Sequence, residues 1–124
     1  MCSSDLFSGA DLSDAVAGSL AAMRGKFVGT NFTGADLEDA RFVDADLSGA
    51  NLEQARLFSA TLLRTNFSGA TADQAEFSSA RMRGANLSGA KIRGARFQNA
   101  DMSEVDLTDA DTRLILMLQF KLAR

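Results

Sequence analysis

The feature that most constrains this chain is a large apolar residue at every fifth position, preceded two residues earlier by a small one. From Ala10 onward the chain divides into five-residue units whose phase never slips, such as ADLSG at 45–49 and ANLSG at 85–89. From residue 25 onward the first position of a unit is usually Ala, otherwise Thr or Gly, and Val105 is an exception. The third positions from residue 27 onward are Phe27, Phe32, Leu37, Phe42, Leu47, Leu52, Leu57, Leu62, Phe67, Ala72, Phe77, Met82, Leu87, Ile92, Phe97, Met102 and Leu107.

A period of five fits neither regular secondary structure. An α-helix repeats about every 3.6 residues and a strand about every 2, so either would scatter the large apolar residues over its whole surface. A unit this short cannot bury its own apolar side chain, and such units must therefore stack on one another as in a solenoid. The sequence predicts that the first and third positions point inward and that the other three face water.

The units ADLSG and ANLSG resemble the consensus of the pentapeptide-repeat family, written A-(D/N)-L-x-x. The resemblance covers roughly residues 5–112. It implies an all-β fold, a right-handed quadrilateral β-helix of about five turns in which each unit forms one side of a square. We therefore assign residues 1–112 to the β-helix and residues 113–124 to a C-terminal cap.

If four units make one turn, residues twenty apart should lie in columns along the solenoid. Half of the ten glycines of the chain fall in one such column at the fifth position of their units. A type II turn needs a positive φ at its third residue, which glycine adopts at little cost. We predict type II turns along this column. Its members are Gly9, Gly29, Gly49, Gly69 and Gly89.

Charged residues spaced by twenty alternate in sign, which supports the same register. One ladder consists of Asp36, Arg56, Glu76 and Arg96. Exposed ion pairs contribute only about 0–1 kcal/mol each. Their expected role is to fix register, because a slipped side would place like charges together.

Asp and Asn at the second positions are expected to bond nearby backbone at the turns rather than to form a reactive site. The chain has no His, and its single Cys has no partner for an internal disulfide. His is the side chain best suited to proton transfer near neutral pH. We therefore expect no catalytic residue, no metal site and no cofactor.

One column breaks the polar pattern of the outward fourth positions. It stacks Met23, Val43 and Leu63, and Phe58 lies at the fourth position of a neighbouring side. Exposed apolar residues have little meaning singly, but a cluster of them indicates an interaction surface. We take these four residues as a candidate interaction patch.

The segment 13–24 admits two readings, which the sequence leaves open. It keeps the five-residue phase, yet Ala17 and Ala22 occupy third positions and Leu20 occupies a first position. As a short helix it would begin at Ser13 and stop at Gly25. In that reading Met23 would leave the candidate patch.

The C-terminal stretch RLILMLQFKLAR at 113–124 abandons the five-residue pattern and becomes strongly apolar. It alternates as a strand would, but its composition favours a helix with Asp111 or Thr112 as the N-cap. We expect this segment to cap the open end of the β-helix and to pair with a second copy of the chain. The face expected for that contact consists of Leu114, Met117, Leu118 and Leu122.

Composition bounds the setting of the protein. The first residues show neither a basic region nor an apolar stretch typical of a secretory signal. No apolar run approaches the length of about 20 residues that is needed to span a bilayer. The lone Cys fits a reducing compartment, so a cytoplasmic location without membrane contact is expected. The net charge of −3 divides into an acidic half before residue 55 and a basic half after it.

The leading hypothesis is a non-catalytic, homodimeric scaffold that binds another protein. The resemblance suggests an alternative, because some bacterial members of the family mimic B-form DNA and bind gyrase. That alternative is weakly supported, since mimicry needs a sustained acidic surface and this chain has a basic C-terminal half. Direct nucleic-acid binding is disfavoured, because the basic residues fall on different sides of the square with little aromatic interleaving.

Overall fold

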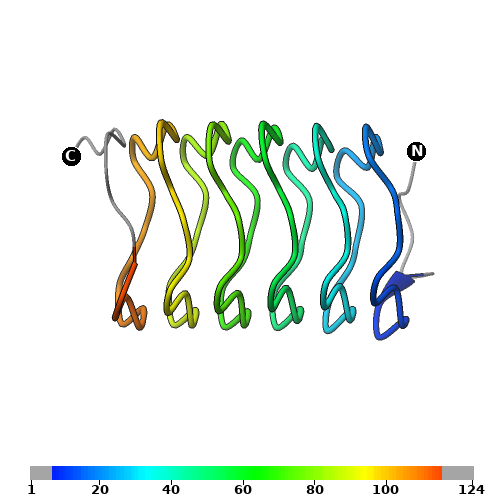
Figure 1. Ribbon diagram of the computed structural model, residues 1–124, viewed down its shortest axis with the longest axis horizontal. Coiled ribbons are helices and arrows are strands. Elements are labelled where there is room, and N and C mark those ends of the chain that lie inside the picture. Colours follow the sequence, from blue (N-terminus) through cyan, green and yellow to red (C-terminus); the bar gives the residue numbers. More distant parts are fainter. Residues whose placement is uncertain (1–6, 116–124) are drawn as a thin grey trace.

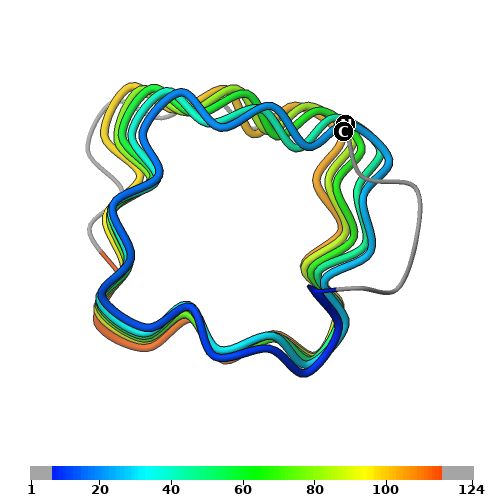
Figure 2. The ribbon, with the colours of Figure 1, turned by 90° about the vertical axis from the view of Figure 1, so that its right-hand side faces the viewer.

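In the computed structural model, which describes residues 7–115, the chain winds into a rod of stacked coils (Figure 1). Seen along the rod axis, the coils lie over one another on a common four-sided outline (Figure 2). Each second-position residue pairs through a single parallel bridge with the residue twenty places later, from Asp11↔Asn31 to Lys91↔Asp111. Within residues 7–115 there is no α-helix, and all strand pairing consists of these isolated bridges. The fold is a four-sided β-helix.

Backbone hydrogen bonds between coils and within turns account for four amides of each unit in the middle of the rod. In unit 45–49 the amide of Asp46 donates to the preceding coil at 2.9 Å. The amides of Leu47 and Gly49 donate to carbonyls of the following coil at 2.7 and 2.9 Å. The amide of Ala50 then closes the turn onto the carbonyl of Leu47 at 3.1 Å. Only the fourth amide lacks a backbone partner, and it lies at the corner where the chain turns.

The turn conformation extends to all four corners, which the glycine pattern alone did not predict. The five glycines of the predicted column have φ between +66° and +74°. Positive φ also occurs at all the remaining fifth positions from residue 14 to residue 114, including Arg24, Gln54 and Leu114. A left-handed conformation costs a non-glycine residue about 1–2 kcal/mol. The turn bond and the bonds to the next coil hold these residues there in spite of that cost.

The third-position side chains fill the interior as a continuous core. From Phe27 to Met102 they are at most 1% exposed, and the first-position alanines between them are equally buried. Phenylalanines meet one another in two clusters along the rod. Phe27 meets Phe42 edge to face at a centroid distance of 5.4 Å, and Phe77 stacks on Phe97 at 5.0 Å.

The helical reading of segment 13–24 is wrong. Val16 and Ala21 form parallel bridges to Asp36 and Arg41, so this segment is an ordinary coil of the β-helix. The adjoining coil supplies the hydrogen bonds that an isolated segment would seek within a helix. In this segment the large residue, Leu20, occupies the first position and the small residue, Ala22, occupies the third. Both side chains still face the core.

The β-helix also continues beyond the expected boundary at residue 112. Asp111 bridges to Lys91, Leu114 occupies a turn with φ +62°, and Ile115 packs partly buried against the core. The expectation that a helix starts at residue 113 is therefore wrong for residues 113–115. Most of the predicted dimer face, Met117, Leu118 and Leu122, lies outside the described residues.

Replacing Ala17 with Leu should stabilise the protein by about 0.5–2 kcal/mol, because it adds apolar volume to an incompletely filled interior. An apolar cavity of about 160 Å³ lies in the N-terminal coils, where small residues occupy third positions. It is lined by Phe7, Leu12, Ala15, Ala17, Leu20, Phe27, Phe32 and Leu37.

Urea unfolding followed by far-ultraviolet circular dichroism measures the change, since the chain has no Trp or Tyr. Ala17→Ser is the matched control and should give no gain, because its hydroxyl finds no polar partner in an apolar cavity. A lower urea midpoint for Ala17→Leu would show that the cavity cannot accept the larger side chain.

Candidate functional site

Aspartates and asparagines at the second positions serve the backbone, as predicted. In unit 45–49 the carboxylate of Asp46 accepts a hydrogen bond from the amide of Ser48 at 3.0 Å, which satisfies the one amide without a backbone partner. Asn86 does the same for the amide of Ser88 at 2.9 Å. The same bond is made by Asp36, Asp46, Asn51, Asn66, Asn86 and Asp106. These side chains are committed to structure.

The charge ladder forms as two ion pairs. Arg56 lies 3.6 Å from Asp36, and Arg96 lies 3.6 Å from Glu76. Arg56 also lies 3.6 Å from Glu38, while a carboxylate oxygen of Glu76 accepts from the amide of Ser78 at 3.2 Å. The four residues follow one another along the column as predicted, but they form two separate ion pairs rather than one continuous ladder.

A closer ion pair lies at the corner next to the apolar residues. Arg64 donates through Nε and Nη2 to the two carboxylate oxygens of Asp44, at 2.7 and 3.1 Å. The hydrogen bond from Arg64 lowers the pKa of Asp44, and Arg24 adds a smaller electrostatic contribution. The carboxylate of Asp44 is thus already engaged by arginine.

The sequence reasoning missed a second network at the C-terminal end of the rod. Asp73 is only 8% exposed, and its carboxylate accepts from Arg93 Nη2 at 2.6 Å and from the Arg93 amide at 2.9 Å. Arg93 Nε also lies 3.8 Å from Asp111, which Arg113 contacts at 2.7 Å. Asp73 and Arg93 are spaced by twenty at fourth positions. The column rule applied to those positions would have found this pair.

Acid should weaken this network, and replacing Asp111 with Asn should reduce that sensitivity. The hydrogen bonds from Arg113 lower the pKa of Asp111 from its usual 3.8 to about 2. A lowered pKa means that the folded state holds the charged form better, so this stabilisation is present above about pH 4 and is lost as the pH falls toward 2. We expect the Tm of Asp111→Asn to fall less over this range than that of the unchanged protein.

Thermal unfolding followed by circular dichroism at several pH values between 5 and 2 provides the measurement. Asn keeps the oxygen that accepts from the Arg113 amide at 3.3 Å, so the substitution removes mainly the charge. Asp109→Asn is the control, because Asp109 forms no ion pair among residues 7–115. An unchanged acid response in Asp111→Asn would contradict the prediction.

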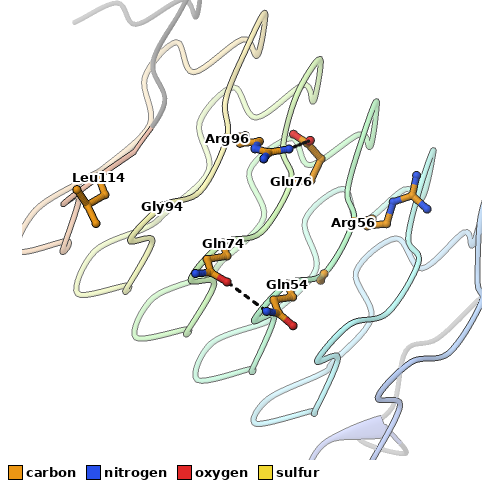
Figure 3. A pocket seen from close by; sticks show the side chains of 8 residues that line it. Gln54, Arg56, Gln74, Glu76, Gly94, Arg96 and Leu114 are labelled. Atoms are coloured by element: carbon orange, nitrogen blue, oxygen red, sulfur yellow. Dashed lines mark hydrogen bonds and ion pairs between the residues drawn. The ribbon is translucent and has the colours of Figure 1, made fainter.

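A shallow groove runs beside one corner of the rod (Figure 3). Gln54 donates from Nε2 to Gln74 Oε1 at 3.1 Å, and the following coil carries Gly94, which leaves a hollow before Leu114. The groove has a volume of about 590 Å³ and is lined by Gln54, Ala55, Arg56, Gln74, Glu76, Gly94, Arg96 and Leu114. Its charged residues belong to the charge ladder. The groove is open and polar, and it offers no enclosed site.

The structure brings three of the four candidate patch residues together. Met23, Val43 and Leu63 stack at fourth positions of successive coils, and we call them the apolar column. Met23 is 47% exposed, and Val43 and Leu63 are partly exposed. Phe58 is 41% exposed but lies at the preceding corner, with Thr61 on the flat side between them. Phe58 is therefore not part of this column.

Arginines flank the apolar column on both sides. Arg41 and Arg81 are exposed on the flat side just before the corner, and Arg24 and Arg64 follow the column at fifth positions. Arg83 continues the column itself and lies 3.8 Å from Glu104. The apolar column and these five arginines together form what we call the basic corner.

A family model for five-residue repeats matches overlapping segments between residues 26 and 109. The model described as pentapeptide repeats, which spans eight copies, matches residues 26–62, 50–89, 60–99 and 73–109. The chain belongs to the pentapeptide-repeat family. Its fold is the right-handed quadrilateral β-helix of that family, as the sequence predicted. No curated protein sequence matches the chain.

Solved structures of other pentapeptide-repeat proteins resemble the rod at low sequence identity. The protein Rfr23 from the cyanobacterium Cyanothece 51142 is 18% identical, with a TM-score of 0.43, covering 93% of this chain and 88% of that one. QnrB1, a plasmid-mediated fluoroquinolone resistance protein, is 19% identical with a TM-score of 0.49, covering 94% and 84%. A thylakoid-lumen protein of Arabidopsis thaliana is 32% identical with a TM-score of 0.30, covering 83% and 68%.

No group of three or more His, Cys, Asp or Glu side chains within 7–115 is arranged to hold a metal ion. In the same part of the pentapeptide-repeat chain, no helix is long and apolar enough to cross a membrane.

Proposed function

We propose that this protein is a non-catalytic scaffold whose outer surface binds another protein. The observation that carries the proposal is the apolar column, in which three apolar side chains, exposed or partly exposed, stack at fourth positions of successive coils, whereas exposed apolar residues at other corners, such as Val28 and Phe58, stand singly. Patches of apolar side chains rimmed by polar ones mark protein–protein contacts. The rigid coils of a solenoid present such residues at fixed spacing without a cost of ordering them on binding.

The interior supports a binding role over a catalytic one. Large apolar side chains that are at most 1% exposed fill the rod between residues 27 and 102, and the apolar cavity in the N-terminal coils is lined by no polar side chain that could act on a substrate. On the outside, the charged groups that line the groove beside Gly94 are engaged in ion pairs, Arg96 with Glu76 and Arg56 with Asp36. The carboxylates at the second positions accept hydrogen bonds from the backbone. These groups already have structural partners.

We further propose that the scaffold is cytoplasmic and forms a homodimer through residues 113–124. The apolar composition of this segment supports the proposal, as does Leu114, which is 85% exposed at the last described turn. Light scattering should give the mass of a dimer for the full chain and of a monomer for a chain ending at Ile115. Monomers for both chains would remove self-association from the proposal.

The scaffold function is tested by quantitative affinity capture from an extract of the source organism, followed by reconstitution. The immobilised full chain should retain a protein that then binds the purified chain directly and at a defined stoichiometry in calorimetry. Heat-unfolded chain serves as the control for adventitious apolar binding. If no retained protein rebinds as a purified component, the scaffold proposal fails.

A DNA mimic that binds gyrase remains the weaker alternative. It is favoured by the acidic half before residue 55, which includes the neighbouring carboxylates Asp36, Glu38 and Asp39. Against it, Arg56 lies 3.6 Å from both Asp36 and Glu38, which interrupts a phosphate-like row of charge. Inhibition of gyrase supercoiling by micromolar protein would support the alternative, and no effect would dispose of it.

A further inference from the structure

We propose that the partner binds the basic corner with an amphipathic α-helix that lies along the rod. The apolar stripe of this helix would pack on Met23, Val43 and Leu63, and acidic residues beside the stripe would pair with the flanking arginines. The inference rests on the scaffold function proposed above and specifies the chemistry of the partner.

The spacing of the apolar column favours a helix over an extended strand. Neighbouring coils of a β-helix are about 4.8 Å apart, because they pair as strands do. Successive turns of an α-helix are about 5.4 Å apart, so a helix drifts from the column by only about 1 Å over its two steps. Same-face residues of a strand are about 6.6 Å apart, which gives a mismatch of about 4 Å over the same two steps. Each turn of a docked helix can therefore place one apolar side chain against each coil of the rod.

The charge of the corner favours an acidic partner. The units 20–24, 40–44, 60–64 and 80–84 together carry five arginines and only one carboxylate, Asp44, although the whole chain has a net charge of −3. Asp44 is engaged by Arg64 at 2.7 Å. Arg41 and Arg81 are exposed and form no ion pair among residues 7–115. Complementary charge speeds association and orients the partner more than it adds affinity.

The apolar column favours a protein helix over nucleic acid as the acidic partner. A phosphate backbone would pair with the arginines, but it would leave Met23, Val43 and Leu63 without apolar contact. A helix that is apolar along one stripe and acidic beside it satisfies both sets of side chains at once. Nucleic acid is therefore treated as a competing outcome of the test.

The corner that carries the column Gly9, Gly29, Gly49, Gly69 and Gly89 provides a matched comparison within the same molecule. Its fourth positions carry Val28, which is 42% exposed, followed by Ser48, Ser68 and Ser88. It thus has one apolar residue, more exposed than Leu63, but no apolar column. Substitutions at Val28 test whether an effect at Leu63 depends on the corner or only on loss of an exposed apolar side chain.

The probe is a fluorescein-labelled synthetic peptide of about 21 residues with Leu at helical i, i+3/i+4 and i+7 spacing and Glu beside the Leu stripe. A second peptide carries Lys in place of every Glu. Fluorescence anisotropy with the full chain should show saturable binding of the acidic peptide and at least about tenfold weaker binding of the basic one. Added salt should weaken binding of the acidic peptide.

Leu63→Asp in the full chain should weaken binding of the acidic peptide at least about tenfold, because it places a charge in the apolar contact. Leu63→Ser copies Ser103 of the same column, so it keeps the fold and should weaken binding in the same direction. The double substitution Arg41→Glu and Arg81→Glu should weaken binding and reduce its salt dependence. Val28→Asp should leave the affinity unchanged.

Several results would overturn the inference. These are no saturable binding of the acidic peptide, equal binding of the two peptides, or equal losses from Val28→Asp and Leu63→Ser. Complete displacement of the peptide by duplex DNA that itself binds more tightly would assign the corner to nucleic acid instead. If the partner from affinity capture still binds Leu63→Asp with full affinity, the scaffold function stands and only the helix-docking inference fails.

Discussion

Replacing Phe77 with Ala is expected to lower the free energy of unfolding by about 3–5 kcal/mol, the usual cost of emptying a buried aromatic position. Phe77 is fully buried, stacks on Phe97 at a centroid distance of 5.0 Å and meets Phe67 edge to face at 6.2 Å. The substitution therefore leaves a cavity and removes two aromatic contacts, each of which contributes about 0.5–1.5 kcal/mol. Urea unfolding followed by far-ultraviolet circular dichroism measures the loss.

Phe58→Ala is the matched control for Phe77→Ala. Phe58 has the same side chain but is 41% exposed at an outward position, so its replacement should change stability by less than about 1 kcal/mol. Similar losses from the two substitutions would mean that the third positions do not form the core on which the fold depends.

Replacing Ala60 with Leu is expected to destabilise the protein by about 1–3 kcal/mol, because the first position has no room for a larger side chain. Ala60 and Leu62 are both fully buried in one unit. The chain itself suggests how this cost is relieved. At residues 20–24 it carries Leu20 in the first position and Ala22 in the third, and this unit still forms a regular side of its coil.

The double variant Ala60→Leu/Leu62→Ala should therefore lose less stability than the two single substitutions together. Leu62→Ala alone should cost about 2–5 kcal/mol, since it empties a core position. In the double variant the added side chain occupies part of that space, and we expect a favourable coupling of about 0.5–3 kcal/mol. The same unfolding measurement on all three variants gives the coupling, and strict additivity would contradict this account of the core.

Much of the architecture could be predicted from the sequence because each inward position repeats without interruption. The five-residue phase identified the large core residues, and the twenty-residue spacing of Asp36 and Arg56 identified residues that lie one coil apart. The roles of Asp46 and Asn86 followed from the known habit of short polar side chains to bond backbone at turns. These predictions depend only on local chemistry and on a strict repeat.

Predictions failed where hydrogen bonds from a neighbouring coil outweigh the conformation that a segment's own residues favour. Segment 13–24 carries helix-compatible residues, yet the neighbouring coil supplies hydrogen bonds that keep it in the β-helix. Arg24 and Gln54 adopt positive φ, although their side chains disfavour that conformation in isolation.

The sequence by itself determined the period, the inward positions and the membership of each column, because a strict repeat permits one way of stacking. Only the tertiary structure decided which members of a column meet. It paired Arg56 with Asp36 and Arg96 with Glu76 along the charge ladder, and it joined Gln54 to Gln74 beside Gly94. Such contacts depend on side-chain directions at each corner, which the order of residues along the chain does not specify.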